Sequence, residues 1–355
     1  MWRNAVTAVL CGASVVLATA SPAEAATWRD VPSAALTYNG GLDRVDFADS
    51  GAGWAVGSQG SIFGPQAMIV RWNGSSWAGQ TSPVGFFPTD VAAASATRAW
   101  AIGYNLTSGT VGIHWNGTAW TKVDYPMVGM PFMVSAAPDG TAYSLAGIDA
   151  SGGGLSAILR WNGTAWVGES VPLPPSTTVT AVEVKSKDDV WLAGTTTDGV
   201  TVTALVMRWN GTSWSRIDVP GSMGTPAYRA AVHRIVVHSP TNVYLDRVAQ
   251  NAQVTNALLR WNGSSWTTIT TPLNAAGVGM SSDGGSGVVV LPPGTGNQTR
   301  YLHYDGSAWT TLTGPARSGT VAANDVDHRP GTTGIGSVGT DSQLTRKVPF
   351  IEYFG

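Results

Sequence analysis

Three aspartates and one histidine are the residues of this chain whose chemistry could drive a reaction: Asp90, His233, Asp325 and Asp327. Carboxyl and imidazole groups that converge on one pocket can transfer protons in a hydrolase or lyase reaction. Asp325 and Asp327 are two residues apart, so on a β-strand they share a face. The other two are distant in sequence, and only the fold can bring all four together. Their catalytic role is therefore a hypothesis about the fold.

Familiar catalytic and metal-binding signatures are absent from the sequence. There is no Gly-x-Ser-x-Gly elbow and no His-Glu-x-x-His helix. His233 and His238 are five residues apart, so on one strand they point to opposite faces and cannot chelate one metal ion. Ser281–Gly285 is the nearest approach to a calcium loop, but it has one acidic residue and is typical of a plain turn. We therefore expect no metal and no cofactor.

A seven-residue motif occurs six times in the chain and predicts the β-strands that must position these residues. The first copy reads Arg-Trp-Asn-Gly-Ser-Ser-Trp, and the copies begin at Arg71, His114, Arg160, Arg208, Arg260 and His303. The starts are 43, 46, 48, 52 and 43 residues apart, a period typical of one four-stranded blade of a β-propeller. Asn-Gly predicts a type I′ hairpin turn between the two outer strands, with positive φ at both central residues. Apolar runs upstream, such as Val190–Gly194, predict the two inner strands.

The two ends of the chain predict seven blades rather than six. Pro349–Gly355 aligns with Met68–Gly74 and begins a seventh copy that lacks its last strand. Trp28–Pro32 resembles that missing strand. We therefore expect an all-β, seven-bladed β-propeller with four antiparallel strands per blade. Its N-terminal strand would pair beside Phe350–Tyr353, complete the C-terminal blade and leave no unpaired radial edge in the ring.

Residues 1–25 predict a secretory signal peptide. Arg3 provides a positive start, residues 6–19 are apolar, and Ala23-Glu24-Ala25 fits a small-x-small cleavage site. Residues 26–355 would then form a single secreted, extracellular propeller domain. Cys11 is the one cysteine of the chain, so the mature protein would contain no disulfide. No further long apolar run follows, and we expect no membrane contact after cleavage.

The paired signature of an aromatic-Ala-Val-Gly strand and a Trp-Asn-Gly-x-x-Trp hairpin resembles the tryptophan-rich propeller repeats of secreted actinobacterial proteins. Kelch and WD-repeat propellers are similar in architecture, but their double Gly and Trp-Asp dipeptides are missing at the equivalent places. The hairpin also resembles that of fucose-binding propeller lectins, which implies sugar pockets made by an Arg, a Glu and an aromatic residue. Here no Glu recurs in step with the Arg.

The repeated Trp and Arg residues have two interpretations. They could form a ring of stacking platforms for sugars, or they could pack between blades. Residues that recur in every blade usually stabilise the fold that all blades have in common, so we favour packing. The Asn-Gly-Ser/Thr sequences are explained in the same way by the turn that they form, without glycosylation.

Apolar loops point to the face of the propeller that carries function. The hairpins described above would all lie on one face, whereas the loops into each next blade lie on the other and differ from blade to blade. Three of these variable loops are apolar: Val84–Pro88, Met127–Met133 and Met223–Tyr228. From them and from the innermost strands we select ligand contacts: Phe86, Phe87, Met130, Phe132, Tyr228, Arg44 and Arg234. Alternatively, the loops cover the core and the polar groups are solvated or pair with one another.

Two functions from different classes remain. The first is a secreted binding protein that recognises a peptide, a glycan or an apolar small molecule on the loop-rich face. The second is an extracellular hydrolase or lyase that uses the acids and His233. The sequence favours binding, because no acid–base set can be assigned by spacing. Charged residues make up 12% of the chain and its net charge is −2, so we expect no binding to nucleic acid. We also expect a monomer.

Overall fold

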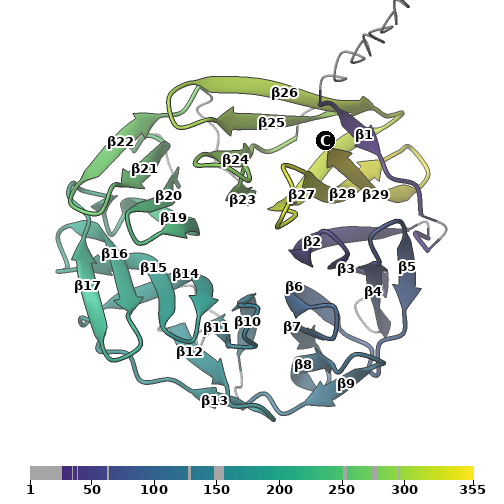
Figure 1. Cartoon of the computed structure of the whole chain (residues 1–355), viewed down its shortest axis with the longest axis horizontal. Helices are drawn as coiled ribbons and strands as arrows, with labels where there is room; N and C mark the ends of the chain where they lie inside the picture. The colour runs from purple at the N-terminus through teal and green to yellow at the C-terminus, as the bar shows by residue number, and fades with distance from the viewer. Residues whose placement is uncertain are drawn as a thin grey trace, which may run out of the picture.

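Figure 1 shows a ring of β-sheets around a central channel. This computed structural model describes residues 26–355 except 34, 38, 62–63, 127–128, 148–155, 251–253, 273–278 and 295. Its described residues form 29 strands in seven antiparallel sheets, and none of them forms a helix that could cross a membrane. The predicted seven-bladed β-propeller is confirmed. The predicted signal peptide, with Cys11, lies outside the described residues.

The first strand of each blade lies next to the channel and later strands follow outward (Figure 1). Blade 1 contains β2 (Gly40–Asp49), β3 (Ala52–Ser61), β4 (Gly64–Trp72) and β5 (Trp77–Gln80). Blade 2 contains β6 (Phe87–Ser95), β7 (Arg98–Asn105), β8 (Gly109–Trp115) and β9 (Trp120–Val123). Blade 3 contains β10 (Met130–Ala136), β11 (Ala142–Gly147), β12 (Ser156–Trp161) and β13 (Trp166–Gly168). Blade 4 contains β14 (Thr177–Ser186), β15 (Asp189–Thr197), β16 (Val202–Trp209) and β17 (Trp214–Asp218).

The remaining blades depart from this plan in two places. Blade 5 contains β19 (Tyr228–Ser239), β20 (Asn242–Ala249), β21 (Ala257–Trp261) and β22 (Trp266–Thr270), and the short β18 (Gly224–Thr225) adds a fifth strand beside β19. Blade 6 contains β23 (Gly279–Ser282), β24 (Val288–Leu291), β25 (Gln298–Tyr304) and β26 (Trp309–Ala316). Blade 7 contains β27 (Thr320–His328), β28 (Ile335–Ser342), β29 (Lys347–Phe354) and, from the other end of the chain, β1 (Trp28–Asp30).

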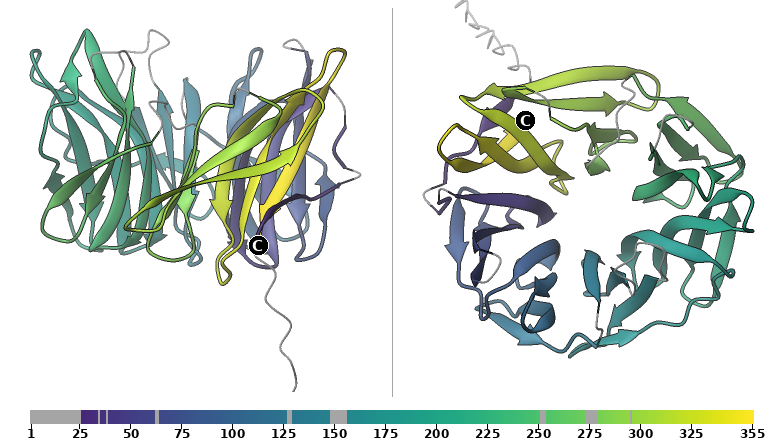
Figure 2. Two further views of the ribbon diagram at one scale, coloured as in Figure 1. Left: turned by 90° about the horizontal axis from the view of Figure 1, so that it is seen from above. Right: turned by 180° about the vertical axis from the view of Figure 1, so that it is seen from behind.

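The N-terminal strand closes the ring, as predicted. β1 begins beside the C-terminal end of β29 (Figure 2) and pairs with it, Trp28 with Phe354 and Asp30 with Glu352. Trp28 is 7% exposed and stacks on Tyr301 of blade 6 with ring centroids 3.7 Å apart. The strand therefore joins blade 7 through its backbone and blade 6 through its side chain.

The predicted alignment of the last strand is wrong by one residue. Phe354 pairs with Trp28 in the way that Trp72 pairs with Trp77, so Phe354 rather than Tyr353 occupies the Trp72 position. Tyr353 consequently occupies the position of the first residue of the repeated seven-residue motif, which is Arg71 in blade 1. The sequence alignment matched Tyr353 to Trp72 and Gly355 to Gly74 by residue type. The hydrogen-bonded ladder shows instead which residues occupy equivalent positions, and it is shifted by one residue.

The hairpin turns are also built differently from the prediction. Trp72 and Trp77 form the last pair of their ladder, and four residues connect them. Gly74 has a φ of +96°, but Asn73 is not among the residues with positive φ. Instead, the Asn73 side-chain Oδ1 accepts hydrogen bonds from the backbone N–H groups of Ser75 and Ser76, at 3.0 and 2.9 Å. The Asn is required for this side-chain turn and not for a type I′ conformation.

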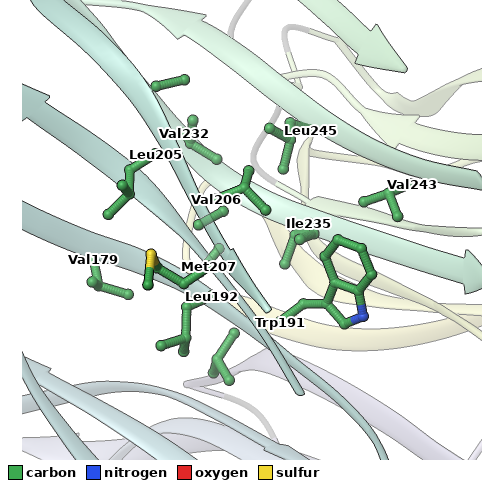
Figure 3. Packing of buried hydrophobic residues seen from close by; sticks show 14 of the residues in the cluster. Val179, Trp191, Leu192, Leu205, Val206, Met207, Val232, Ile235, Val243 and Leu245 are labelled. Atoms are coloured by element: carbon green, nitrogen blue, oxygen red, sulfur yellow. The ribbon is translucent and has the colours of Figure 1, made fainter. Parts of the chain in front are cut away.

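Aromatic side chains fill the space between blades. Trp54 of β3 points at blade 2, where its ring centroid lies 6.3 Å from that of Trp115 and 6.4 Å from that of Trp120. The Arg71 guanidinium lies over the Trp54 ring at 5.4 Å, a favourable cation–π arrangement. Figure 3 shows Trp191, the equivalent of Trp54, in the apolar cluster between blades 4 and 5. These contacts support packing as the role of the repeated residues.

We expect closure of the ring to depend on Trp28. Trp28→Ala removes a buried ring and its stacking on Tyr301, and should lower the free energy of unfolding by about 3–5 kcal/mol. Trp72→Ala is the matched control, because Trp72 belongs to the equivalent pair in blade 1 but is half-buried, and its loss should be clearly smaller. Urea denaturation followed by circular dichroism measures both. Equal losses would show that closure contributes nothing beyond ordinary hairpin packing.

Candidate functional site

The central channel is the candidate functional site. It contains a cavity of about 550 Å³ lined by the innermost strands. Each of these strands pairs with its own blade on one side, and on the other side β19 alone has a strand partner among the described residues, the two-residue β18 at its start. Most backbone N–H groups on these edges therefore have no strand partner. An unpaired backbone N–H is costly unless it finds water or a side-chain acceptor. The channel is therefore built around seven strand edges that are free along most of their length.

Two positions on each innermost strand point toward the next blade. The upper position, nearer the loop-rich face, is occupied in blades 1 to 7 by Arg44, Asp90, Met133, Ala181, Arg234, Gly279 and Asp325. The lower position comes two residues later and is occupied by Asp46, Ala92, Ser135, Glu183, Val236, Ser281 and Asp327. Each lower-position residue pairs with the second-strand residue equivalent to Trp54, which fixes the alignment.

The lower positions connect neighbouring blades through side-chain acceptors. The Asp327 carboxylate accepts from the Phe47 N–H at 2.9 Å, and the Glu183 carboxylate accepts from the Val237 N–H at 3.1 Å. The same geometry recurs at three further seams: Asp46 with Ala93, Ser135 with Val184, and Ser281 with His328. Five of the seven seams are thus connected by one lower-position side chain that binds the free edge of the next blade.

Two upper-position aspartates do the same. Asp90 accepts from the Val134 N–H at 2.8 Å, and Asp325 accepts from the Val45 N–H at 3.1 Å. Asp90 also binds the N–H of its neighbour Val91 at 3.0 Å with its other oxygen. The sequence-selected acids therefore each hold a strand edge, and both oxygens of Asp90 are engaged.

Two arginines bring positive charge to the upper positions. The Arg44 Nε lies 3.8 Å from the Asp90 Oδ1, and the Arg234 Nη2 lies 4.0 Å from the Asp325 Oδ1. Arg44 also lies within electrostatic range of Asp325, and Asp90 within range of Arg234. The four side chains thus form one cluster of alternating charge in the channel.

Burial changes the proton affinity of the channel acids. It raises the pKa of Asp90 to about 6, although Arg44 and Arg234 oppose the shift. It raises the pKa of Asp327 to about 7, with a smaller contribution from the nearby charge of Asp325. Burial and the charge of Asp327 together raise the pKa of Asp46 well above its usual range. These carboxyl groups hold protons at a pH where free aspartates have lost them.

The structure brings most of the predicted polar residues together. Asp90, Arg234, Asp325 and Asp327 line the same cavity. His233 does not line it; its backbone N–H donates to the Asp246 carboxylate at 2.8 Å. The convergence of three acids is therefore found, but without the predicted histidine. The described residues contain no group of three or more His, Cys, Asp or Glu side chains able to hold a metal ion.

The predicted apolar contacts divide into buried and accessible residues. Phe86 is 0% exposed and packs in the core of blades 1 and 2, so its selection as a ligand contact is wrong. Met130 and Tyr228 are 54% and 53% exposed. Phe87 and Phe132 are half-buried. Met223 is also buried, and Met127 lies outside the described residues.

Sequence reasoning missed several residues of the channel. Asp46, Glu183 and Lys185 line the cavity with the predicted acids, and Lys185 forms an ion pair with Glu183 at 3.2 Å. A signal was available: Asp46 follows Arg44 by two residues, as Asp327 follows Asp325. His238 and His328 also line the cavity. The sequence analysis selected residues at the starts of the innermost strands, which are mostly upper positions. More of the acidic residues lie at the lower positions.

Comparison with known proteins identifies relatives in shape only. No family model matches the chain, and no curated protein matches it in sequence. A structure of YCF48 bound to D1 peptide is similar with a TM-score of 0.57 and 12% identity, covering 93% of this chain and 96% of that one. The fucose-specific lectin from Aleuria aurantia has a TM-score of 0.51 and 12% identity, covering 79% and 97%. A PL25 polysaccharide lyase, an ulvan lyase, has a TM-score of 0.57 and 10% identity, covering 91% and 95%.

These neighbours share the propeller fold at identities too low to carry function. Propellers of this shape include proteins that bind peptides, a lectin and a polysaccharide lyase. The fold is therefore compatible with both functions derived from the sequence, and the choice between them depends on the residues of this chain.

The raised pKa values predict that stability falls as pH rises. The folded state holds protons that the unfolded chain releases near pH 4, so the stability contributed below that pH is lost as pH rises to about 7. We expect the melting temperature to fall between pH 5 and pH 8, and to fall less in Asp327→Asn. Asp305→Asn is the control, because the pKa of Asp305 is about 2, lowered by hydrogen bonds from Ala308 and Ser307. An Asp327→Asn profile parallel to that of the parent would contradict the assignment.

Proposed function

We propose that this protein is a secreted binding protein that holds a peptide at the loop-rich mouth of its channel. The observation that carries the proposal is the charged cluster at the upper positions, in which both arginines stay beyond hydrogen-bond distance of their aspartates. A cluster of opposite charges near a channel mouth suits a ligand that carries a carboxylate and an amino group, as a peptide does.

The arginines retain capacity to bind such a ligand. Arg44 donates from its Nη1 to the Asp43 carbonyl at 2.8 Å, and Arg234 donates from its Nη1 to the His233 carbonyl at 3.2 Å. A guanidinium has five donors arranged as a planar fork that fits a carboxylate with two parallel hydrogen bonds. Donors beyond these backbone contacts would be available to a ligand carboxylate.

Accessible apolar residues near the channel mouth would provide the rest of the contact. Met130 and Tyr228 begin β10 and β19 at the loop-rich end. Phe87 begins β6, and Phe132 is the third residue of β10. Methionine adapts to irregular partners, and tyrosine offers an apolar ring with a polar tip. Apolar walls around a few orienting polar groups are the usual composition of a ligand site.

Two further considerations support binding over catalysis. Asp90, Asp325 and Asp327 already accept backbone N–H groups of neighbouring blades, which restricts their movement toward a substrate. Moreover, one structural neighbour is described with a bound peptide and another as a fucose-specific lectin. A hydrolase or lyase remains the alternative, because a carboxyl group with a pKa near 6 or 7 suits proton transfer.

We expect Arg44 and Arg234 to contribute much of the affinity for a peptide. A peptide selected from a random library on the purified protein should bind at least about tenfold more weakly to Arg44→Gln and to Arg234→Gln, which is about 1.4 kcal/mol per variant. Arg216→Gln is the control, since Arg216 lies on the outer strand β17. Calorimetry measures the affinities. Selection of glycans but no peptides from parallel arrays, or turnover of any array member, would refute the proposal.

We also propose that residues 1–25 are removed during export, on the basis of the sequence pattern alone. The mature protein should begin at Ala26, two residues before β1, so that the closing strand remains intact. N-terminal sequencing of protein recovered from the medium tests this. A secreted chain that retained Cys11 would disprove both the cleavage site and the expected absence of cysteine.

A further inference from the structure

Two seams of the propeller lack the aromatic side chain that occupies the equivalent position at the other five, and at one of them the position is a glycine. The second-strand residues that pair with the lower positions of blades 1 to 7 are Trp54, Trp100, Tyr143, Trp191, Tyr244, Val289 and Gly336. The first five point toward the hairpin of the next blade, as Trp54 points at Trp115 and Trp120. At the seam from blade 7 to blade 1, Gly336 offers no side chain.

Phe47 and Arg329 partly replace the aromatic ring and the arginine that are missing from this seam. A Cβ at Gly336 would lie 2.6 and 2.7 Å from the Phe47 ring, so Phe47 of blade 1 reaches into the place of the missing ring from the other side. The equivalent positions of blades 2 and 3 carry the small residues Ala93 and Ala136. Arg329 replaces the missing cation: it donates to the Ser50 carbonyl at 2.7 Å, as Arg71 donates to the Ala96 carbonyl at 2.9 Å.

The replacement is incomplete, and a pocket remains. Its volume is about 350 Å³, within the range of small-molecule sites. Aromatic rings form much of its wall: Phe47, Trp72, Trp77 and Tyr353. Arg29 and Asp30 of the closing strand β1 form part of its lining and are exposed. The pocket therefore lies between the hairpin of blade 1 and the strand that closes the ring, away from the central channel.

The charges around the pocket favour an anion. Its two acids, Asp30 and Glu352, both form ion pairs with Arg317, which lies outside the lining. Arg329 forms no ion pair within the described part of the chain. Its guanidinium lies over the rings of Tyr353 and Trp72, at 4.7 and 5.0 Å. Its Nε is buried and has no hydrogen-bond partner among the described residues, as is also true of Arg71 at the seam from blade 1 to blade 2, so a ligand carboxylate would meet the outer nitrogens of the guanidinium.

We propose that this seam pocket binds a small aromatic acid, with the ring between Phe47 and the other aromatic residues of the wall, and the carboxylate at Arg329. A planar ring would restore the aromatic packing that Trp54 and Trp100 provide at the seams after blades 1 and 2. Offset and edge-to-face contacts with surrounding rings favour an aromatic guest over an aliphatic one. A carboxylate matches the fork of the guanidinium and balances its charge. The site is separate from the channel mouth and independent of the peptide proposal.

Indole-3-propionate is a suitable probe, because it carries a ring of the missing kind together with a carboxylate. Tryptamine carries the same ring with an amine, and glucose is a neutral sugar. By calorimetry on the purified protein, indole-3-propionate should bind at one site per chain and at least about tenfold more tightly than tryptamine or glucose. Equal binding of the acid and the amine, stronger binding of glucose, or no saturable binding at millimolar concentration would each overturn the proposal.

Filling the pocket should abolish binding. Phe47→Ala combined with Gly336→Trp gives this seam the residue types found at the seam from blade 1 to blade 2, and should weaken indole-3-propionate at least about tenfold. Val200→Trp is the matched control, since it adds a tryptophan at a site that is 72% exposed and outside the pocket. A double variant that folds and binds as well as the parent would exclude the seam as the site.

Arg329→Gln tests the anion contact while it keeps every aromatic residue of the pocket, and it tests the proposal independently if the double variant does not fold. It should reduce the preference for the acid over the amine to less than about threefold. Arg234→Gln, at the channel mouth, should leave that preference unchanged. The opposite pattern, with the preference lost in Arg234→Gln and kept in Arg329→Gln, would assign the binding to the channel.

Discussion

The free inner edge of each blade is the constraint on which the rest of the structure depends. Seven sheets arranged radially leave seven strands with one side that is unpaired along most of its length at the channel, where backbone N–H groups need acceptors. The chain supplies them from side chains, mostly carboxylates and hydroxyls at the lower positions. A short acidic side chain can bridge the gap to the next blade, whereas one backbone cannot reach the other. Blade contacts at the channel thus depend on polar residues, and contacts farther out depend on tryptophan.

This arrangement concentrates acids in a confined space and explains their behaviour. Burial of Asp46, Asp90 and Asp327 raises each pKa, while hydrogen bonds from backbone N–H groups partly compensate. A perturbed carboxyl group in a cavity is commonly a sign of catalysis, but ion-pair and hydrogen-bond networks that hold a fold perturb pKa values as well. Here the structural cause is visible at each acid. The arginines at the upper positions contact the backbone less: Arg234 donates to the His233 carbonyl beside it, and Arg44 donates to the Asp43 carbonyl and, at 3.5 Å, to the Asn324 carbonyl of blade 7. They are therefore better candidates for ligand contact.

The repeat made the architecture predictable. A spacing of 43 to 52 residues and an unfinished seventh copy were enough to predict seven blades and the closing strand. Details that depend on three-dimensional pairing were not accessible in this way. The register of Phe354 follows from its ladder, the role of Asn73 from a side-chain hydrogen bond, and the burial of Phe86 from a loop that turns inward. The convergence of Asp90, Asp325 and Asp327 could be suggested by strand alignment, but their attachment to the next blade could not.

Closure by the N-terminal strand has a consequence for how the chain reaches its native state. Arg29 donates a hydrogen bond to the Gly355 carbonyl across a sequence separation of 326 residues, so this contact closes a very long loop at a cost in entropy. Until then β29 presents a bare edge, and the first and last blades have no neighbour on one side. Such an edge can recruit a strand from another molecule. The rate at which β1 pairs with β29 would therefore affect how much of the chain forms a closed ring and how much aggregates.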